Sequence, residues 1–288
     1  MVVRRSPVSG IAVLAAAVLA ASLAHAAEPP RGGPCRWAVV ATRAAGPRDV
    51  PFDAGNRALA EPIDWNHARG PGALWAMVRN DAAHHGHIFL DDSAAGTSHT
   101  LLARWACMPA WSPDGRWIAC NTWVSRERPY VLVLVELASG RTWEPPLTGQ
   151  VGEYRWSPDS KYVAADVVGG AWELGALVLV DPAKRTFAPL DSAVVFGDYE
   201  YAWAPDSRTL AVVKPSRMDV SYTDEVSDSD LWLMGVDLTR CKVLPGHGAR
   251  FGEPRWMDAR HVLYTREVWG PESTSPPKRR VLTLAPAK

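Results

Sequence analysis

The sequence has no excess of either charge, and this limits the partners that it can attract. Its 31 Lys and Arg residues balance 31 Asp and Glu residues, so the formal net charge is +0 at pH 7. A protein without a basic surface field has no long-range attraction for the phosphates of nucleic acid or for anionic lipid. We therefore expect neither of these to be a partner.

Long apolar runs are also scarce. The only prominent run, Ile11 to Ala24, is shorter than the roughly 20 residues that a transmembrane helix needs. Two arginines precede this run, and Ala24-His25-Ala26 leads into a proline-rich segment. These are the three parts of a secretory signal peptide with cleavage after Ala26. We expect residues 1–26 to be removed and residues 27–288 to form a single periplasmic or secreted domain with no transmembrane segment.

Common catalytic motifs are missing. The sequence contains no Gly-x-Ser-x-Gly elbow, no His-Glu-x-x-His motif and no phosphate-binding loop. Apolar residues do not recur at the 3.6-residue period of helices either. Sequence alone therefore identifies no catalytic residue, and we expect no cofactor.

Tryptophan, proline and glycine, in contrast, are abundant, with 14, 24 and 22 residues. The stretch AWSPDGRWIAC, from Ala110 to Cys120, recurs along the chain with its tryptophan at regular intervals. The copies centre on Trp65, Trp111, Trp156, Trp203 and Trp256, with spacings of 46, 45, 47 and 53 residues. A period of about 45 residues with several short strands in each unit is typical of propeller blades.

Each unit has the same internal order. A strand ends at the tryptophan, a Ser-Pro-Asp-Gly turn reverses the chain, and three further short strands follow. The turn positions are Pro113, Asp114 and Gly115, then Pro158 and Asp159, then Pro205 and Asp206. We expect an all-β propeller of four-stranded antiparallel blades, in which Trp111, Trp156, Trp203 and Trp256 pack between blades and the aspartates fix the turns.

At these residues the chain resembles the WD40-like repeats built on a Trp-Ser-Pro-Asp-Gly turn, found in the propellers of TolB and of prolyl oligopeptidases. The resemblance implies an interaction platform. TolB, however, has a separate α/β domain before its propeller, whereas only about 36 residues, Ala27 to Pro62, lie here between the leader and the first repeat. Only the architecture is therefore carried over.

Five tryptophan-centred units predict five blades. The last unit lacks its fourth strand, so a strand near the N-terminus must complete it and close the ring with strands from both termini. Arg36 to Arg43 and Arg57 to Pro62 are the candidates. Six blades would result if Arg36 to Pro62 and the C-terminal strands formed two partial blades.

Four cysteines follow the repeat geometry. Cys107 lies six positions before Pro113 and Cys120 six positions after Asp114, so a tight hairpin predicts a disulfide between them. Cys35 and Cys241 would pair only if the N-terminal segment reached the outer edge of the fourth unit.

The loops between the second and third strands lie on one face, together with the connections between blades. Two of them, Lys214 to Asp230 and Arg266 to Arg280, are longer than the fold requires, which favours a role in binding. The candidate binding residues are Tyr222, Asp224, Glu225, Asp228, Asp230 and Trp269. The acidic ones offer oxygen ligands but lack the calcium-loop spacing. A second cluster, His84, His85, His87, Asp91 and Asp92, is read either as a transition-metal site or as a polar hairpin bend; we expect no bound metal at either.

Three functions remain open. The first is a platform for a protein or a cell-envelope component on the loop-rich face. The second is an enzyme with a metal or acidic site in the central channel. The third is a sugar or small-ligand sensor that uses exposed aromatic rings such as Trp172, Tyr222 and Trp269.

Overall fold

The computed structural model describes residues 35–52, 64–126, 130–168, 175–193, 200–219, 225–268 and 276–287. In these ranges the regular elements are twenty β-strands. No helix in this part of the chain has the length and apolar character needed to cross a bilayer. The expected leader, the segment Arg57 to Pro62, and Trp172, Tyr222, Asp224 and Trp269 lie outside the described residues.

The strands form five four-stranded antiparallel sheets. We number the sheets in chain order and give their strands from the innermost outward. Sheet 1 contains β2 (His67–Arg69), β3 (Leu74–Asn80), β4 (Gly86–Asp92) and β5 (Thr97–Leu102). Sheet 2 contains β6 (Ala106–Trp111), β7 (Trp117–Thr122), β8 (Val131–Glu136) and β9 (Arg141–Trp143). Sheet 3 contains β10 (Gln150–Trp156), β11 (Val163–Val168), β12 (Gly175–Asp181) and β13 (Thr186–Ala193). Sheet 4 contains β14 (Glu200–Trp203), β15 (Thr209–Asp219), β16 (Glu225–Gly235) and β17 (Arg240–Leu244). Sheet 5 contains β18 (Ala249–Trp256), β19 (His261–Val268), β20 (Lys278–Pro286) and β1 (Trp37–Ala44).

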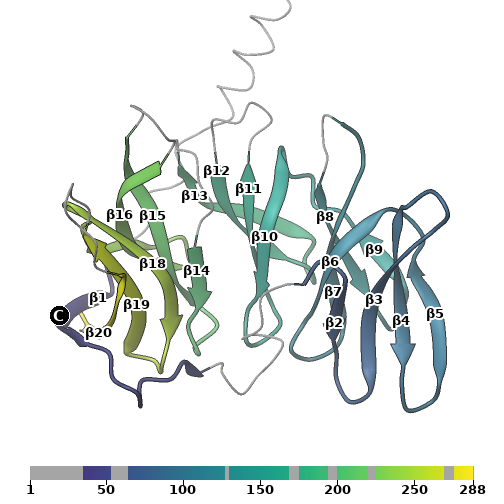
Figure 1. The fold of residues 1–288 in the computed structure, drawn as a ribbon, viewed down its shortest axis with the longest axis horizontal. Helices are drawn as coiled ribbons and strands as arrows, with labels where there is room; N and C mark the ends of the chain where they lie inside the picture. The colour runs from purple at the N-terminus through teal and green to yellow at the C-terminus, as the bar shows by residue number, and fades with distance from the viewer. Residues whose placement is uncertain are drawn as a thin grey trace, which may run out of the picture.

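This architecture confirms the predicted all-β fold with five four-stranded blades. The sheets follow one another in chain order, and sheets 1 and 5 stand at opposite ends of the view in Figure 1. Closure of the ring between these two sheets stays a prediction.

Sheet 5 is built from both ends of the chain. The N-terminal strand β1 pairs antiparallel with β20, from Trp37 opposite Pro286 to Ala44 opposite Arg280. Arg36 to Arg43, one of the two candidate segments, therefore supplies the missing fourth strand. The two ends of the chain build one sheet instead of two partial ones, which argues against the six-bladed alternative.

Apolar clusters fill the spaces between consecutive sheets. In the described residues, separate clusters join sheets 1 and 2, sheets 2 and 3, sheets 3 and 4, and sheets 4 and 5. Each strand alternates its side chains between two such interfaces, so the middle strands are apolar on both faces. This explains the continuous apolar runs of β8 and β12, which are buried along most of their length.

One tryptophan in each of sheets 2 to 5 forms a hydrogen bond with the preceding sheet. Each of the four indoles is at most 5% exposed, and each donates its Nε1–H to a backbone carbonyl of the preceding innermost strand. The pairs are Trp111 with Ala68 (3.1 Å), Trp156 with Ala110 (3.1 Å), Trp203 with Arg155 (3.0 Å) and Trp256 with Ala202 (3.2 Å). The carbonyl in sheets 2, 3 and 4 belongs to the residue just before that sheet's own tryptophan.

This hydrogen-bond pattern also shows that the alignment of the first repeat on Trp65 was wrong. In sheet 1 the acceptor is Ala68, so the repeat position belongs to Arg69. The turn after it is one residue shorter than the turn after Trp111, since Arg69 pairs with Trp75 and Trp111 with Ile118. Trp65 is 55% exposed, and its indole makes no such bond to another sheet within the described part of the chain. Trp65 is the tryptophan nearest to residue 69 in the sequence, but residue 69, which holds the repeat position, is an arginine.

Hydrogen bonds within and between turns fix the Pro-Asp turns. Asp114 accepts hydrogen bonds from Ser112 Oγ and from the backbone N–H of Arg116, and Asp159 accepts the equivalent pair in its own turn. Asp206 accepts the backbone N–H groups of Arg208 and Thr209. Neighbouring turns are also joined, because the backbone N–H of Asp114 donates to Ser160 Oγ (2.9 Å) and that of Asp159 to Ser207 Oγ (3.0 Å). These contacts align the turns of sheets 2, 3 and 4.

The predicted disulfide between Cys107 and Cys120 is not formed, and both residues are free thiols. The hairpin pairs Trp111 with Ile118, so its centre lies one residue beyond the one assumed, and a bulge between Cys107 and Ala110 then changes the pairing again. Cys107 therefore lies opposite Asn121. It packs toward sheet 3, whereas Cys120 packs toward sheet 1, so the two sulfurs lie on opposite faces of sheet 2.

The disulfide joins Cys35 to Cys241 instead. Cys35 lies two residues before the start of β1, and Cys241 lies in β17, the outermost strand of sheet 4. The bond therefore ties the N-terminal segment of sheet 5 to sheet 4. This is the geometry under which the sequence allowed these two cysteines to pair.

Candidate functional site

The antiparallel order of the strands gives the array two distinct ends. Turns from the first to the second strand and from the third to the fourth lie at one end, which we call the turn face. Loops from the second to the third strand and the connections between sheets lie at the other end, the loop face. The binding loops expected from the sequence belong to the loop face.

Much of the long loop predicted between Lys214 and Asp230 is strand. β15 and β16 extend to 11 residues each, and their ladder pairs Lys214 with Asp230 and Asp219 with Glu225. The sequence hid this extension because its polar residues resemble a loop. Of the candidate binding residues, Glu225 begins β16, and Asp228 lies opposite Arg217 in the ladder.

Asp230 has a structural position. Its residue is 6% exposed, its carboxylate accepts the backbone N–H of Gly246 (2.9 Å), and it forms an ion pair with Lys242. A carboxylate held in this way is not presented to a ligand.

The histidine cluster is a hydrogen-bonded hairpin bend. Asp81 accepts the backbone N–H groups of Ala83 and His85 (2.8 and 3.0 Å), and its second oxygen lies 3.2 Å from Nε2 of His87. The bond from His85 is the main reason that the pKa of Asp81 lies below its ordinary value. Asp91 is bonded to Arg79 and Ser98, and Asp92 caps the following turn. The described residues contain no group of three or more His, Cys, Asp or Glu that would hold a metal ion.

A continuous strip of aromatic rings crosses the loop face of sheets 1 and 2. The centroids of His85 and Trp105 lie 5.2 Å apart, as do those of Trp105 and Trp123. Tyr130 follows at 5.8 Å from Trp123, and Trp65 at 6.2 Å from Tyr130. We call these five residues the aromatic strip. Trp65 is 55% and Trp105 40% exposed, and the adjacent Val124 is 48% exposed, so the strip is an apolar surface open to solvent.

The strip is held by backbone hydrogen bonds. Trp65 O accepts the N–H of Met108 (3.1 Å), Trp105 O that of Trp123 (2.9 Å), and Tyr130 O that of Val151 (2.9 Å). Four of its rings therefore stand on segments that are anchored to an innermost strand or to each other. Partial burial raises the pKa of Tyr130 above its ordinary value. Such a preorganised set of rings loses little conformational entropy when it binds a partner.

Sequence reasoning did not identify this strip. It considered His85 as a metal ligand and Trp65 as a repeat tryptophan. One signal could have revealed the strip. Trp105, Trp123 and Tyr130 each lie next to the end of a strand, on the side that faces the loops.

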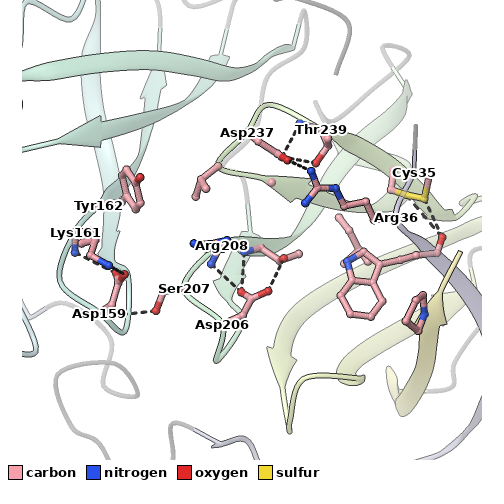
Figure 2. Close-up of a pocket in the computed structure, with 17 residues that line it drawn as sticks. Cys35, Arg36, Asp159, Lys161, Tyr162, Asp206, Ser207, Arg208, Asp237 and Thr239 are labelled. Carbon is pink, nitrogen blue, oxygen red and sulfur yellow. Dashed lines mark hydrogen bonds and ion pairs between the residues drawn. A yellow bond between two sulfur atoms is a disulfide. The ribbon is translucent and has the colours of Figure 1, made fainter. Parts of the chain in front are cut away.

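A pocket of about 400 Å³ lies on the turn face, between sheets 3 and 4 and the residues before β1. Figure 2 shows Asp159, Lys161 and Tyr162 on one side, Asp206, Ser207 and Arg208 in the middle, and Cys35, Arg36, Asp237 and Thr239 on the other side. The Cys35–Cys241 disulfide and Trp37 form part of its wall. No residue of this pocket belongs to the aromatic strip.

Comparison with solved structures shows a propeller fold. The β-propeller domain of the Trilobed protease from Pyrococcus furiosus matches with a TM-score of 0.55 and 13% identity, over 76% of this chain and 69% of that one. An oligogalacturonate lyase from Vibrio parahaemolyticus matches with a TM-score of 0.51 and 14% identity, over 88% and 71%. TolB from Acinetobacter baumannii matches with a TM-score of 0.42 and 14% identity, and this chain spans 54% of its length.

The likeness is one of architecture. No protein-family model matches the sequence, and no curated protein matches it either. At these identities the neighbours share the fold, and their activities do not transfer to this chain.

Proposed function

We propose that this protein is a binding module whose partner docks on the aromatic strip of the loop face. The observation that carries the proposal is the unbroken contact of five rings from His85 to Trp65, with two tryptophans largely open to solvent. Tryptophan and tyrosine dominate the energetic centres of protein interfaces, since each buries a large area with few rotatable bonds. A protein of the cell envelope is the partner that this surface fits best.

The place where this function operates is also part of the proposal. The leader pattern of residues 1–26 and the Cys35–Cys241 disulfide both support an exported, single-domain mature protein. Processing by a signal peptidase would leave Ala27 as the first residue. N-terminal sequencing of protein recovered from the periplasm or the medium tests this, and an intact Met1 in that material would contradict it.

Photo-cross-linking in cells tests the docking surface. A photoreactive residue replaces Val124 beside the strip, or Phe187 on the turn face, which is 41% exposed and serves as the matched control. We expect adducts from position 124 and far fewer from position 187. The double substitution W105A/W123A should abolish the adducts from position 124 while the melting temperature changes little.

Two outcomes would overturn the proposal. Equal adduct yields from positions 124 and 187 would show that the strip is not the docking surface. Adducts that survive W105A/W123A would show that the rings do not contribute. Mass spectrometry of the adduct distinguishes a protein partner from a glycan, and a glycan adduct would move the protein to the sugar-sensor class.

An enzyme is the second candidate, because three glutamates occupy the same repeat position. Glu153, Glu200 and Glu253 each lie three residues before the repeat tryptophan on successive innermost strands. The Glu200 carboxylate accepts the backbone N–H of Glu253, and Arg155 lies 3.3 Å from the Glu153 carboxylate. Metal analysis and assay with acidic oligosaccharides test this candidate. Activity that is lost in E153Q and retained in W105A/W123A would favour it over binding.

A further inference from the structure

The turn-face pocket has its hydrogen-bond acceptors occupied. The Asp206 carboxylate accepts bonds from the backbone of Arg208 and Thr209 and from the Thr209 hydroxyl, at 2.8 to 2.9 Å. Asp159 accepts from Ser157 Oγ and from the backbone N–H of Lys161. Each of these carboxylates fixes its own turn, so it has little capacity left for a ligand.

Asp237 is held in the same way. Its carboxylate accepts the Thr239 hydroxyl (2.7 Å) and faces the Arg36 guanidinium at 2.5 Å. Partial burial works to raise the pKa of Asp237, but the bonds from Thr239 and the charge of Arg36 outweigh it, so this pKa lies below its ordinary value. The third carboxylate of the pocket is therefore ionised and already paired.

The groups in the pocket that remain able to form hydrogen bonds with a ligand are N–H donors. The Arg208 guanidinium has no ion pair or hydrogen bond to any other described side chain, and it carries five N–H groups. The side chains of Arg36 and Lys161 are each 71% exposed, and each contacts one carboxylate, so both retain unpaired N–H groups. Three cations thus border one cavity in which the carboxylates are saturated.

Apolar groups line the same cavity. Trp37, Tyr162 and Val236 contribute to its wall, and Leu233 lies in its floor. The Cys35–Cys241 disulfide anchors the residue next to Arg36, which holds this cation at the pocket rim. A cavity of about 400 Å³ with apolar walls and a few charged donors is typical of small-molecule sites.

We propose that the turn-face pocket binds a small organic anion, with a carboxylate or phosphate at Arg208, Arg36 and Lys161 and an apolar portion against Trp37 and Tyr162. This site lies on the opposite face from the aromatic strip. It therefore goes beyond the proposed docking function and does not depend on it.

Calorimetric titration with simple probes tests this site. Phenyl phosphate and benzoate carry the two anionic groups beside an apolar ring, and phenol is the neutral control. We expect saturable binding of at least one anion, no comparable binding of phenol, and weaker binding as salt rises. The stronger of the two anions identifies the anionic group, and inorganic phosphate shows how much the ring adds.

The chain offers a matched control for the key cation. Arg116, Lys161 and Arg208 each lie five residues after a repeat tryptophan, but Arg116 does not line the pocket. R208Q should weaken binding of the anion about tenfold or more, the usual effect of removing a charged hydrogen-bond donor, whereas R116Q should leave it unchanged. Both variants should keep the wild-type melting temperature, because both side chains are exposed.

Three results would overturn the inference. These are the absence of saturable binding by either aromatic anion, equal binding of phenol, and equal losses in R208Q and R116Q. None of them bears on cross-linking at position 124, so the two proposals fail independently.

Discussion

The indole of Trp111 lies directly against the backbone of Gly70 in the preceding sheet. A Cβ atom added at Gly70 would come within 2.4 to 2.8 Å of three atoms of this ring. The tryptophan that bonds sheet 2 to sheet 1 therefore depends on a glycine in sheet 1 that leaves room for it.

Gly70→Ala should consequently destabilise the protein by about 1–3 kcal/mol, the usual cost of overpacking a well-packed site. Urea unfolding monitored by circular dichroism measures the change. Gly46→Ala is the control, because the nearest atom to its added Cβ is a carboxylate oxygen at 3.8 Å. Equal effects of the two substitutions would show that the contact with Trp111 is not responsible.

Trp156→Phe separates the contribution of the packed ring from that of its hydrogen bond. Phenylalanine keeps a ring between sheets 2 and 3 but loses the Nε1–H that donates to the Ala110 carbonyl at 3.1 Å. We expect the free energy of unfolding to fall by about 1–2 kcal/mol in Trp156→Phe and by about 3–5 kcal/mol in Trp156→Ala. Trp65→Phe, at an exposed position, should change the free energy of unfolding by less than about 0.5 kcal/mol. A larger effect at Trp65 than at Trp156 would reverse the assignment of the repeat position.

Removing the disulfide should loosen the N-terminal strand. C35S/C241S is expected to lose about 2–5 kcal/mol, because the bond closes a sequence separation of 206 residues. Hydrogen exchange should increase first in β1 and in its pairing partner β20. A reductant should lower the melting temperature of the wild type and leave that of the double variant unchanged.

The free thiols predict a loss of stability in alkali. Burial raises the pKa of Cys107 from 9.0 to about 11 and that of Cys120 from 9.0 to about 12. Below pH 9 both thiols are protonated in the folded and the unfolded chain, so their contribution to stability is complete. Between pH 9 and 12 the unfolded thiols ionise while the folded ones stay protonated, so the free energy of unfolding falls with pH. In C120A this decline should be shallower, and identical slopes in wild type and variant would contradict the assignment.

Asp191 should be the most costly carboxylate to neutralise. Its side chain is 3% exposed and contacts Lys214 at 2.6 Å and Arg240 at 2.8 Å, which joins sheet 3 to sheet 4. Asp191→Asn leaves two partly buried cations poorly compensated, and we expect a loss of about 2–4 kcal/mol. Lys184→Gln breaks the exposed pair with Asp181 and should cost at most about 0.5 kcal/mol. Similar costs for the two substitutions would show that burial of Asp191 does not matter.

The repeat made the fold predictable. Trp111, Trp156 and Trp203 recur with the same turn, and this periodicity predicted both the strand number and the sheet number. The first unit was misplaced because Arg69 replaces the tryptophan, so residue identity gave no signal for the register. The Cys107–Cys120 pairing failed because a bulge moves backbone pairing in a way that residue counting does not detect.

The two candidate sites were not predictable for a different reason. The aromatic strip gathers Trp65 and Tyr130 from opposite ends of a long segment, and the turn-face pocket combines Arg36 with Arg208. Such proximity depends on how consecutive sheets rotate and on where β1 docks. Strand periodicity carries neither kind of information.

Of the described strands, β1 comes first in the sequence and its partner β20 comes last. The pairing of β1 with β20 therefore has a very high contact order, and we expect it to form slowly. The Cys35–Cys241 bond ties the residues just before β1 to β17, so it shortens the loop that must close when β1 pairs with β20. A truncated translation product that lacked β20 would leave β1 unpaired, and its exposed edge would mark it for aggregation or degradation.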